Sequence, residues 1–163
     1  MKSKIISMLI IISPLHANAA FEQYKPLVVP IQGLKEQSNT CTPNLIKEDM
    51  CIQAKKLAGN VQKELPIKSG DNLYITNVKA DNTRVIITAE MKYNRNALEH
   101  AYQNNDSDID KAKKILSYNA ENSVCQNKIL MSFINLGGVI QYEYVFNDGN
   151  LFNIVAVSSC KTT

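Results

Sequence analysis

The stretch GGVIQYEYVFNDGNLFNIVAVSSC, residues 137–160, alternates side chains on both sides of Asp148-Gly149 and ends in a cysteine. An Asp-Gly pair between two such segments is typical of a two-residue type I′ turn, so this stretch predicts a β-hairpin. The predicted cross-strand pairs are Ile140 with Val157, Tyr142 with Val155, Tyr144 with Asn153 and Phe146 with Leu151. Because this face is almost entirely apolar, we expect it to be the core face.

A second hairpin is predicted in NLYITNVKADNTRVIITAEMKY, residues 72–93, with its turn at Asp81-Asn82. The turn places a largely apolar set on one face, which we expect to be core: Tyr74, Thr76, Val78, Val85, Ile87, Ala89 and Met91. The opposite faces of the two hairpins remain less polar than a solvated sheet face usually is. We therefore expect either intramolecular cover, by an N-terminal arm or a helix, or a contact surface for another protein or a second copy of the chain. The candidate contact residues are Arg84, Ile86, Glu143, Phe152 and Ile154.

Helical periodicity fills the segments around the hairpins. A first helix is predicted to start at Thr42-Pro43 and to stop at Pro66, a second region spans residues 94–119 with a break near residues 103–110, and a third helix runs from about Asn122 to Gly137. The expected fold is α+β: an antiparallel sheet of four to five strands from two β-hairpins, with helices packed on one face. The possible fifth strand is Leu27–Ile31, in an extended arm over residues 20–40.

The N-terminus has the features of a secretory signal peptide. Lys2 and Lys4 precede an apolar run over residues 5–13, and Ala17-Asn18-Ala19 suits cleavage after Ala19. We therefore expect a signal peptide over residues 1–19, a single domain over residues 41–163 and a periplasmic or secreted location. The run is too short for a membrane span, and a lipid anchor is not expected because no cysteine lies near the cleavage site.

Four cysteines follow the predicted cleavage site, so two disulfides are expected in an oxidising compartment. Three pairings are possible, and the favoured one joins Cys41 to Cys51 and Cys125 to Cys160. The first of these bridges requires a late start or a break in the first helix, because an unbroken helix from Pro43 would hold the two α-carbons too far apart.

The residues give little support to catalysis. After signal removal His100 is the sole histidine, and no nucleophile motif accompanies it. Asp106, Asp108 and Asp110 resemble the start of a calcium loop, but Lys111 and Ser117 occupy the positions that need glycine and glutamate. Those acids are expected to cap a helix, so no metal or cofactor is predicted. Loss of Lys2 and Lys4 lowers the formal net charge from +3 to +1, and this near-neutral chain is not expected to bind nucleic acid.

The favoured hypothesis is an exported, non-enzymatic accessory or adaptor subunit of an envelope assembly of the secretion or pilus type. One alternative is an immunity protein or an inhibitor of a wall-degrading enzyme, which would also be small, exported and disulfide-bonded. A further alternative is a small hydrolase that uses carboxylates with a tyrosine or His100.

Overall fold

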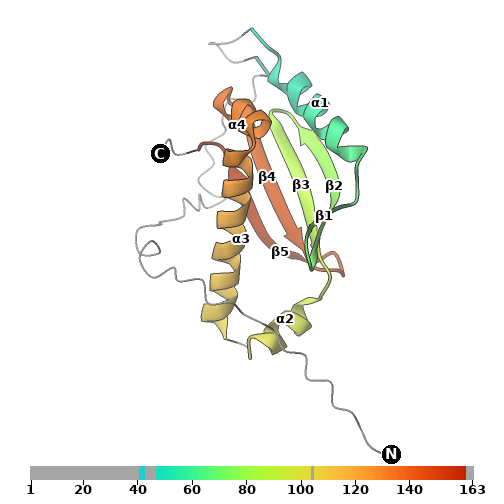
Figure 1. The fold of residues 1–163 in the computed structure, drawn as a ribbon, viewed down its shortest axis with the longest axis vertical. Coiled ribbons are helices and arrows are strands. Elements are labelled where there is room, and N and C mark those ends of the chain that lie inside the picture. Colours follow the sequence, from blue (N-terminus) through green and yellow to red (C-terminus); the bar gives the residue numbers. More distant parts are fainter. Residues whose placement is uncertain (1–40, 43–46, 104, 161–163) are drawn as a thin grey trace, which may run out of the picture.

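A five-stranded sheet with helices on one face forms the protein in the computed structural model, which describes residues 41–42, 47–103 and 105–160 (Figure 1). The strands lie in sequence order across the sheet: Ile67–Gly70 (β1), Leu73–Asp81 (β2), Arg84–Met91 (β3), Val139–Val145 (β4) and Leu151–Val157 (β5). The predicted signal peptide, the arm and its strand at Leu27–Ile31 lie outside the described residues. In the described part of the chain, no helix is both long and apolar enough to cross a membrane.

The predicted α+β class is confirmed, with two differences in the sheet. The fifth strand is β1, a short polar strand that sequence analysis did not predict. The central pair β3–β4 is parallel, whereas the other three pairs are antiparallel. The pair is parallel because three helices carry the chain from the end of β3 back to the end where β3 began.

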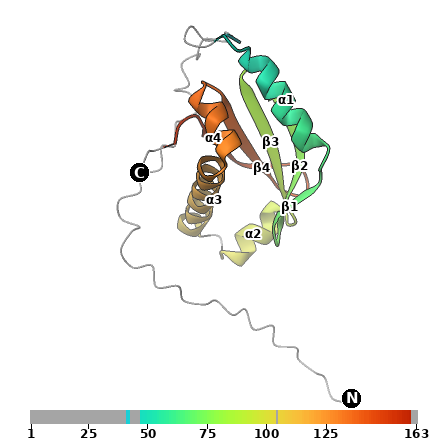
Figure 2. The same cartoon turned by 45° about the horizontal axis from the view of Figure 1, so that its top comes forward.

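In the described part of the chain, four helices accompany the sheet: Met50–Gln62 (α1), Arg95–Ala101 (α2), Asp106–Gln126 (α3) and Lys128–Asn135 (α4). Helices α1, α3 and α4 pack on the same face of the sheet, as expected, and Figure 2 shows α1 on one side of that face and α3 and α4 on the other. The main core lies beneath them, with contributions from Met50, Val85, Val124, Phe133 and Ile140. A smaller cluster joins α2 to the far end of the sheet through Leu98, Met91 and Phe146.

The first helix begins at Met50, and the predicted start at Thr42-Pro43 was therefore wrong. Asp49 caps it, because its carboxylate accepts hydrogen bonds from the backbone N–H groups of Cys51 and Ile52 at 2.9 and 3.0 Å. The late start leaves Cys41 outside the helix, where it forms a disulfide with Cys51 at a Cα–Cα distance of 5.1 Å. This is the condition that the favoured pairing required.

The second disulfide joins Cys125, in the last turn of α3, to Cys160, which follows β5. Both favoured pairs are thus present in the structure. Cys125 was expected in the same helix as Phe133, but Asn127 ends α3 and caps α4, so the predicted boundary at Asn122 was wrong. Gly137 ends the α4 region with φ of 97°, the positive value expected of a glycine after a helix.

The first hairpin differs from its predicted register both at the turn, where Asp81-Asn82 was wrong, and at an irregularity within β2. The turn is formed by Asn82-Thr83, and Asn82 has a positive φ of 52°. The register shifts between Ile75 and Asn77, so that Ile75, instead of Tyr74, lies on the core side and packs against the main cluster. The predicted core residues of β3 (Val85, Ile87, Ala89 and Met91) are all buried.

The second hairpin keeps three of its four predicted pairs: Ile140 with Val157, Tyr142 with Val155, and Tyr144 with Asn153. The fourth was wrong, because Leu151 pairs with Val145 and the register shifts beside it. The loop is also longer than a two-residue turn. The N–H of Phe146 donates to the carbonyl of Asn150, and Gly149 adopts a φ of 81°, as glycine does in three-residue hairpin loops.

Candidate functional site

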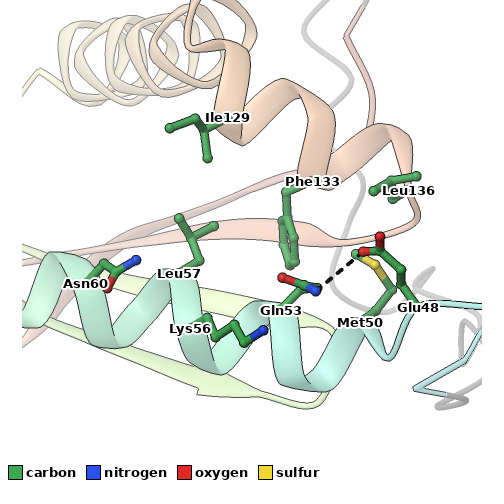
Figure 3. A pocket seen from close by; sticks show the side chains of 9 residues that line it. All are labelled: Glu48, Met50, Gln53, Lys56, Leu57, Asn60, Ile129, Phe133 and Leu136. Atoms are coloured by element: carbon green, nitrogen blue, oxygen red, sulfur yellow. Dashed lines mark hydrogen bonds between the residues drawn. The ribbon is translucent and has the colours of Figure 1, made fainter.

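An apolar groove of about 320 Å³ lies between α1 and α4 (Figure 3). The α1 side carries Met50, Gln53, Lys56, Leu57 and Asn60, with Glu48 just before the helix, and the α4 side carries Ile129, Phe133 and Leu136. The two walls differ, because every side chain that lines the α4 wall is apolar. Polar groups therefore come from the α1 side.

The groove has a buried floor and an exposed apolar rim. Met50 and Phe133 are 0% and 6% exposed and belong to the main core, so they fix the base of the groove. Ile129 is 69% exposed and Leu136 is 38% exposed, although both are large apolar side chains. An apolar rim joined to a fixed floor is typical of a surface that binds another apolar group.

Close packing beneath α4 holds the Phe133 ring in place. A Cβ atom built on Gly138 would lie 2.3 Å from Cε1 of this ring, so the ring needs the open space over a glycine. Any larger residue at position 138 would displace the ring or the backbone. The sequence motif Gly137-Gly138 thus serves both the end of the helix and the floor of the groove.

The polar residues of the groove lie on the α1 side. The side-chain amide of Gln53 donates to a Glu48 carboxylate oxygen at 3.4 Å (Figure 3). Lys56 lines the groove from the same helix and is exposed. This wall therefore offers one acid, one base and two amide side chains, which can orient a ligand without carrying a strong net charge.

The face of the sheet opposite the helices brings four of the five predicted contact residues together. Arg84 donates to the Gln141 side-chain oxygen at 3.0 Å, and the Gln141 amide donates to Glu143 at 2.9 Å. Ile86 pairs with Gln141, and Ile154 pairs with Glu143. Ile86 is only 7% exposed, so the part of this face that it occupies is not open.

Phe152 does not lie with them, and its predicted face was wrong. The register shift at the end of β5 brings Phe152 into the smaller cluster, with its ring centroid 5.3 Å from that of Phe146. The ammonium group of Lys113, from α3, lies 5.7 Å from the Phe152 ring centroid. Phe152 is thus covered from the helix side.

A second cavity, of about 250 Å³, lies between α3 and the sheet and contains Tyr142 and Tyr144. Their rings stack with centroids 6.0 Å apart, and the hydroxyl of Tyr144 donates to the Leu116 carbonyl at 3.3 Å. Burial raises the pKa of both hydroxyls. Tyrosines that hold their protons and fill space beneath a helix serve mainly as core, as the sequence analysis expected.

The residues considered for catalysis or metal binding lie on helices. His100 is exposed in the last turn of α2. Asp108 and Asp110 form ion pairs with Lys111 and Lys113 along α3. Asp106 and Asp108 lie in the first turn of α3, but the expectation that the acids cap the helix was wrong, because the cap is Asn105, whose side chain accepts a hydrogen bond from the Ser107 N–H at 3.1 Å. Within the described residues, one group has a spacing suited to a metal ion: Cys41, Asp49 and Cys51. Both of its cysteines are in a disulfide, so they offer no thiolates.

Sequence analysis missed the groove because its residues follow the same periodicity as a core. Ile129, Phe133 and Leu136 recur at helical spacing in the third predicted helix, as core residues do, and of these three Phe133 is buried. The available signal was the composition of α4, KILMSFIN, which is apolar around most of a short helix. A helix packed on one side by its sheet cannot bury all of these side chains.

No protein-family model matches the chain, and no curated protein sequence matches it. Among solved structures, the chain is similar to the pilotin EpsS from the Vibrio vulnificus type 2 secretion system, with a TM-score of 0.55 at 15% identity, over 70% of this chain and 94% of that one. It is also similar to the type II secretion system pilotin AspS from Vibrio cholerae, with a TM-score of 0.49 at 20% identity, over 67% and 88% of the two chains. The likeness to EpsS shows a shared α+β fold.

Proposed function

We propose that this protein is an exported, non-enzymatic accessory subunit of a secretion assembly in the cell envelope, which acts by binding a segment of a partner protein in the α1–α4 groove. The observation that carries the proposal is the fold shared with a type 2 secretion pilotin across almost all of that chain. The groove supplies the place for the contact. Export is supported by the N-terminal signal pattern and by the two disulfides.

The walls of the groove decide what kind of segment it can hold. Both walls are helices, whose backbone groups are already hydrogen-bonded, so a bound chain cannot gain backbone partners there as it would at a sheet edge. A segment that buries itself in this groove must satisfy its own backbone groups, and an α-helix does so. The partner segment is therefore an amphipathic helix that presents apolar side chains at i, i+3 or i+4, and i+7.

The dimensions agree with a short helix. The lining residues of α1 extend from Met50 to Asn60, which corresponds to roughly 15 Å at 1.5 Å per residue. About three turns of a partner helix would fill that length. Glu48 lies before the start of α1, and Lys56 lies within it, so charges on the partner helix would select its direction.

A charge introduced at the exposed rim tests the groove without altering the buried core. Ile129→Asp places a carboxylate at a site that is 69% exposed, so the fold should persist while an apolar helix is rejected. Ile115→Asp, on α3 at 53% exposure and outside the groove, is the matched control. With a photo-crosslinking residue at Lys56 in cells, we expect Ile129→Asp to reduce the crosslinked partner at least ten-fold and Ile115→Asp to leave it within two-fold.

The captured protein decides between the function hypotheses. Mass spectrometry should identify an envelope component of a secretion system. Equal capture by both variants would contradict the groove as the binding site. Capture of a wall-degrading enzyme, with loss of its activity, would replace the accessory role with that of an inhibitor.

A further inference from the structure

The cavity of about 250 Å³ between α3 and the sheet differs from the groove in the chemistry of its lining. Among the described residues that line it, none is charged. The polar ones are Ser69, Asn119, Asn122, Ser123, Tyr142 and Tyr144. The groove, by contrast, is lined by both Glu48 and Lys56. Because no charged side chain lines the cavity, an ion that entered it would lose water without gaining a counter-charge, so the cavity suits a neutral occupant.

Helix α3 supplies one polar wall of the cavity. Asn119, Asn122 and Ser123 are three and four positions apart, so they lie on one face of the helix. The Asn122 side-chain oxygen already accepts a hydrogen bond from the Gln126 amide at 2.9 Å. The side chains of Asn119 and Ser123 make no hydrogen bond with another described residue. Their donors and acceptors are therefore available to an occupant of the cavity.

Strand β4 supplies a polar group from the sheet. Tyr142 is half-buried, and its hydroxyl makes no hydrogen bond with another described residue, whereas the Tyr144 hydroxyl donates to the Leu116 carbonyl at 3.3 Å. Among the described residues, a side-chain nitrogen of Asn153 is the buried polar atom that lacks a partner. The Tyr142 hydroxyl, which also lacks one, is therefore still open to solvent and can bond to an occupant of the cavity.

The sheet also gives the cavity an apolar floor. Leu73 and Ile75, from β2, and Ala89, from β3, line it together with the tyrosines. Ser69, exposed on the edge strand β1, adds another hydroxyl group. An occupant thus meets carbon atoms on one side and amide and hydroxyl groups around them. A sugar ring has the matching surface, because its C–H face is apolar and its hydroxyl groups both donate and accept hydrogen bonds.

We propose that this cavity binds one neutral hexopyranose ring, whose C–H face lies on the apolar floor and whose hydroxyl groups bond to Asn119, Ser123 and Tyr142. The volume suits one ring, since pockets for drug-sized ligands begin at about 300 Å³. A ligand of roughly 12 to 15 non-hydrogen atoms should bind with a dissociation constant of roughly 1–10 mM. The site is separate from the α1–α4 groove, because no residue lines both.

Titration with neutral and charged sugars tests the proposal. Amide chemical shifts of the exported chain are followed by NMR at about pH 6 while glucose, N-acetylglucosamine, glucuronate or protonated glucosamine is added. We expect both neutral sugars to cause saturating shifts in the amides around Asn119 on α3 and around Tyr142 on β4. The two charged sugars should bind at least about five-fold more weakly, because each brings a charge that finds no partner in the cavity.

Three substitutions test where the sugar lies. Tyr142→Phe removes a hydroxyl group and keeps the ring, and Asn119→Ala removes an exposed amide. Each should raise the dissociation constant of the neutral sugars at least about four-fold, as the loss of one hydrogen bond does. Asn135→Ala is the matched control, because this exposed asparagine on α4 lines neither the cavity nor the groove. It should leave the dissociation constant within about 1.5-fold, and thermal unfolding of all three variants checks that the fold persists.

Three results would overturn the proposal. The absence of saturating shifts up to about 50 mM sugar, several times the largest expected dissociation constant, would mean that the cavity holds water only. Equal binding of the neutral and charged sugars would contradict selection for a neutral ring. Folded Tyr142→Phe and Asn119→Ala variants that bind as tightly as Asn135→Ala would place the sugar elsewhere on the protein.

Discussion

The two faces of the sheet bury side chains by different means. Ile140, beneath the helices, is 0% exposed and belongs to the main core, whereas its neighbour Gln141, on the opposite face, is 7% exposed. Gln141 is held by hydrogen bonds to Arg84 and Glu143, in a row of polar side chains across β3 and β4. Two residues with similar burial therefore contribute differently to the free energy of unfolding. Apolar contact with the helices drives folding, whereas a row of hydrogen-bonded polar side chains adds little net stability.

The two faces also differ in how well they could bind another protein. The helix-covered face holds the main core, and the groove proposed for binding lies between α1 and α4. On the opposite face Arg84 and Glu143 are both hydrogen-bonded to the Gln141 side chain, so they would have to give up these bonds to contact another protein. The groove is thus the better contact surface, because its exposed Ile129 and Leu136 gain from burial.

The largest expected effect comes from a charge on the helix-covered face. Ile140→Asp places a carboxylate in the fully buried core, where loss of apolar contacts and desolvation together should cost more than about 5 kcal/mol. We expect no cooperative thermal transition by circular dichroism. Ile154→Asp, half-buried on the opposite face, should retain one. If both variants unfold, the opposite face is also closed core, and the contrast between the faces is wrong.

A smaller effect is expected at the end of β5, where the register shift decides on which face of the sheet Phe152 lies. Phe152→Ala removes contacts with Phe146 and should lower the free energy of unfolding by about 3 kcal/mol. Leu151→Ala, at 48% exposure, should lower it by less than about 1 kcal/mol. Urea denaturation measures both. If both substitutions have equal, small effects, Phe152 does not pack on the helix-covered face and lies instead on the opposite face, as the alternating pattern predicted.

Phe152 shows which features of the fold can be predicted from the sequence and which cannot. Alternation and turn signals were enough for the fold class and three cross-strand pairs, because those features depend on local periodicity. The disulfide pairing that the structure contains was the favoured one of three, chosen from the number and spacing of the cysteines. One extra residue in a strand reverses the faces beyond it, and no residue type marked the shifts beside Ile75 and Val145. The parallel β3–β4 pair and β1 were missed because they depend on long-range packing. The groove was missed because Ile129 has the same residue type and spacing as a core position.

The smallest effect concerns two tyrosines on opposite faces. Burial raises the pKa of Tyr144 on the helix-covered face, whereas a hydrogen bond with the Lys92 side chain lowers the pKa of Tyr74 on the other face. Above about pH 10 the unfolded chain loses the Tyr144 proton that the folded chain keeps, so this stability is present at neutral pH and is lost as the pH rises. Between pH 8 and pH 11, urea denaturation should show a shallower decline in stability for Tyr144→Phe than for the natural sequence. Tyr74→Phe should not reduce the decline, because the folded state favours ionisation of Tyr74. An unchanged decline in Tyr144→Phe would mean that this hydroxyl reaches solvent.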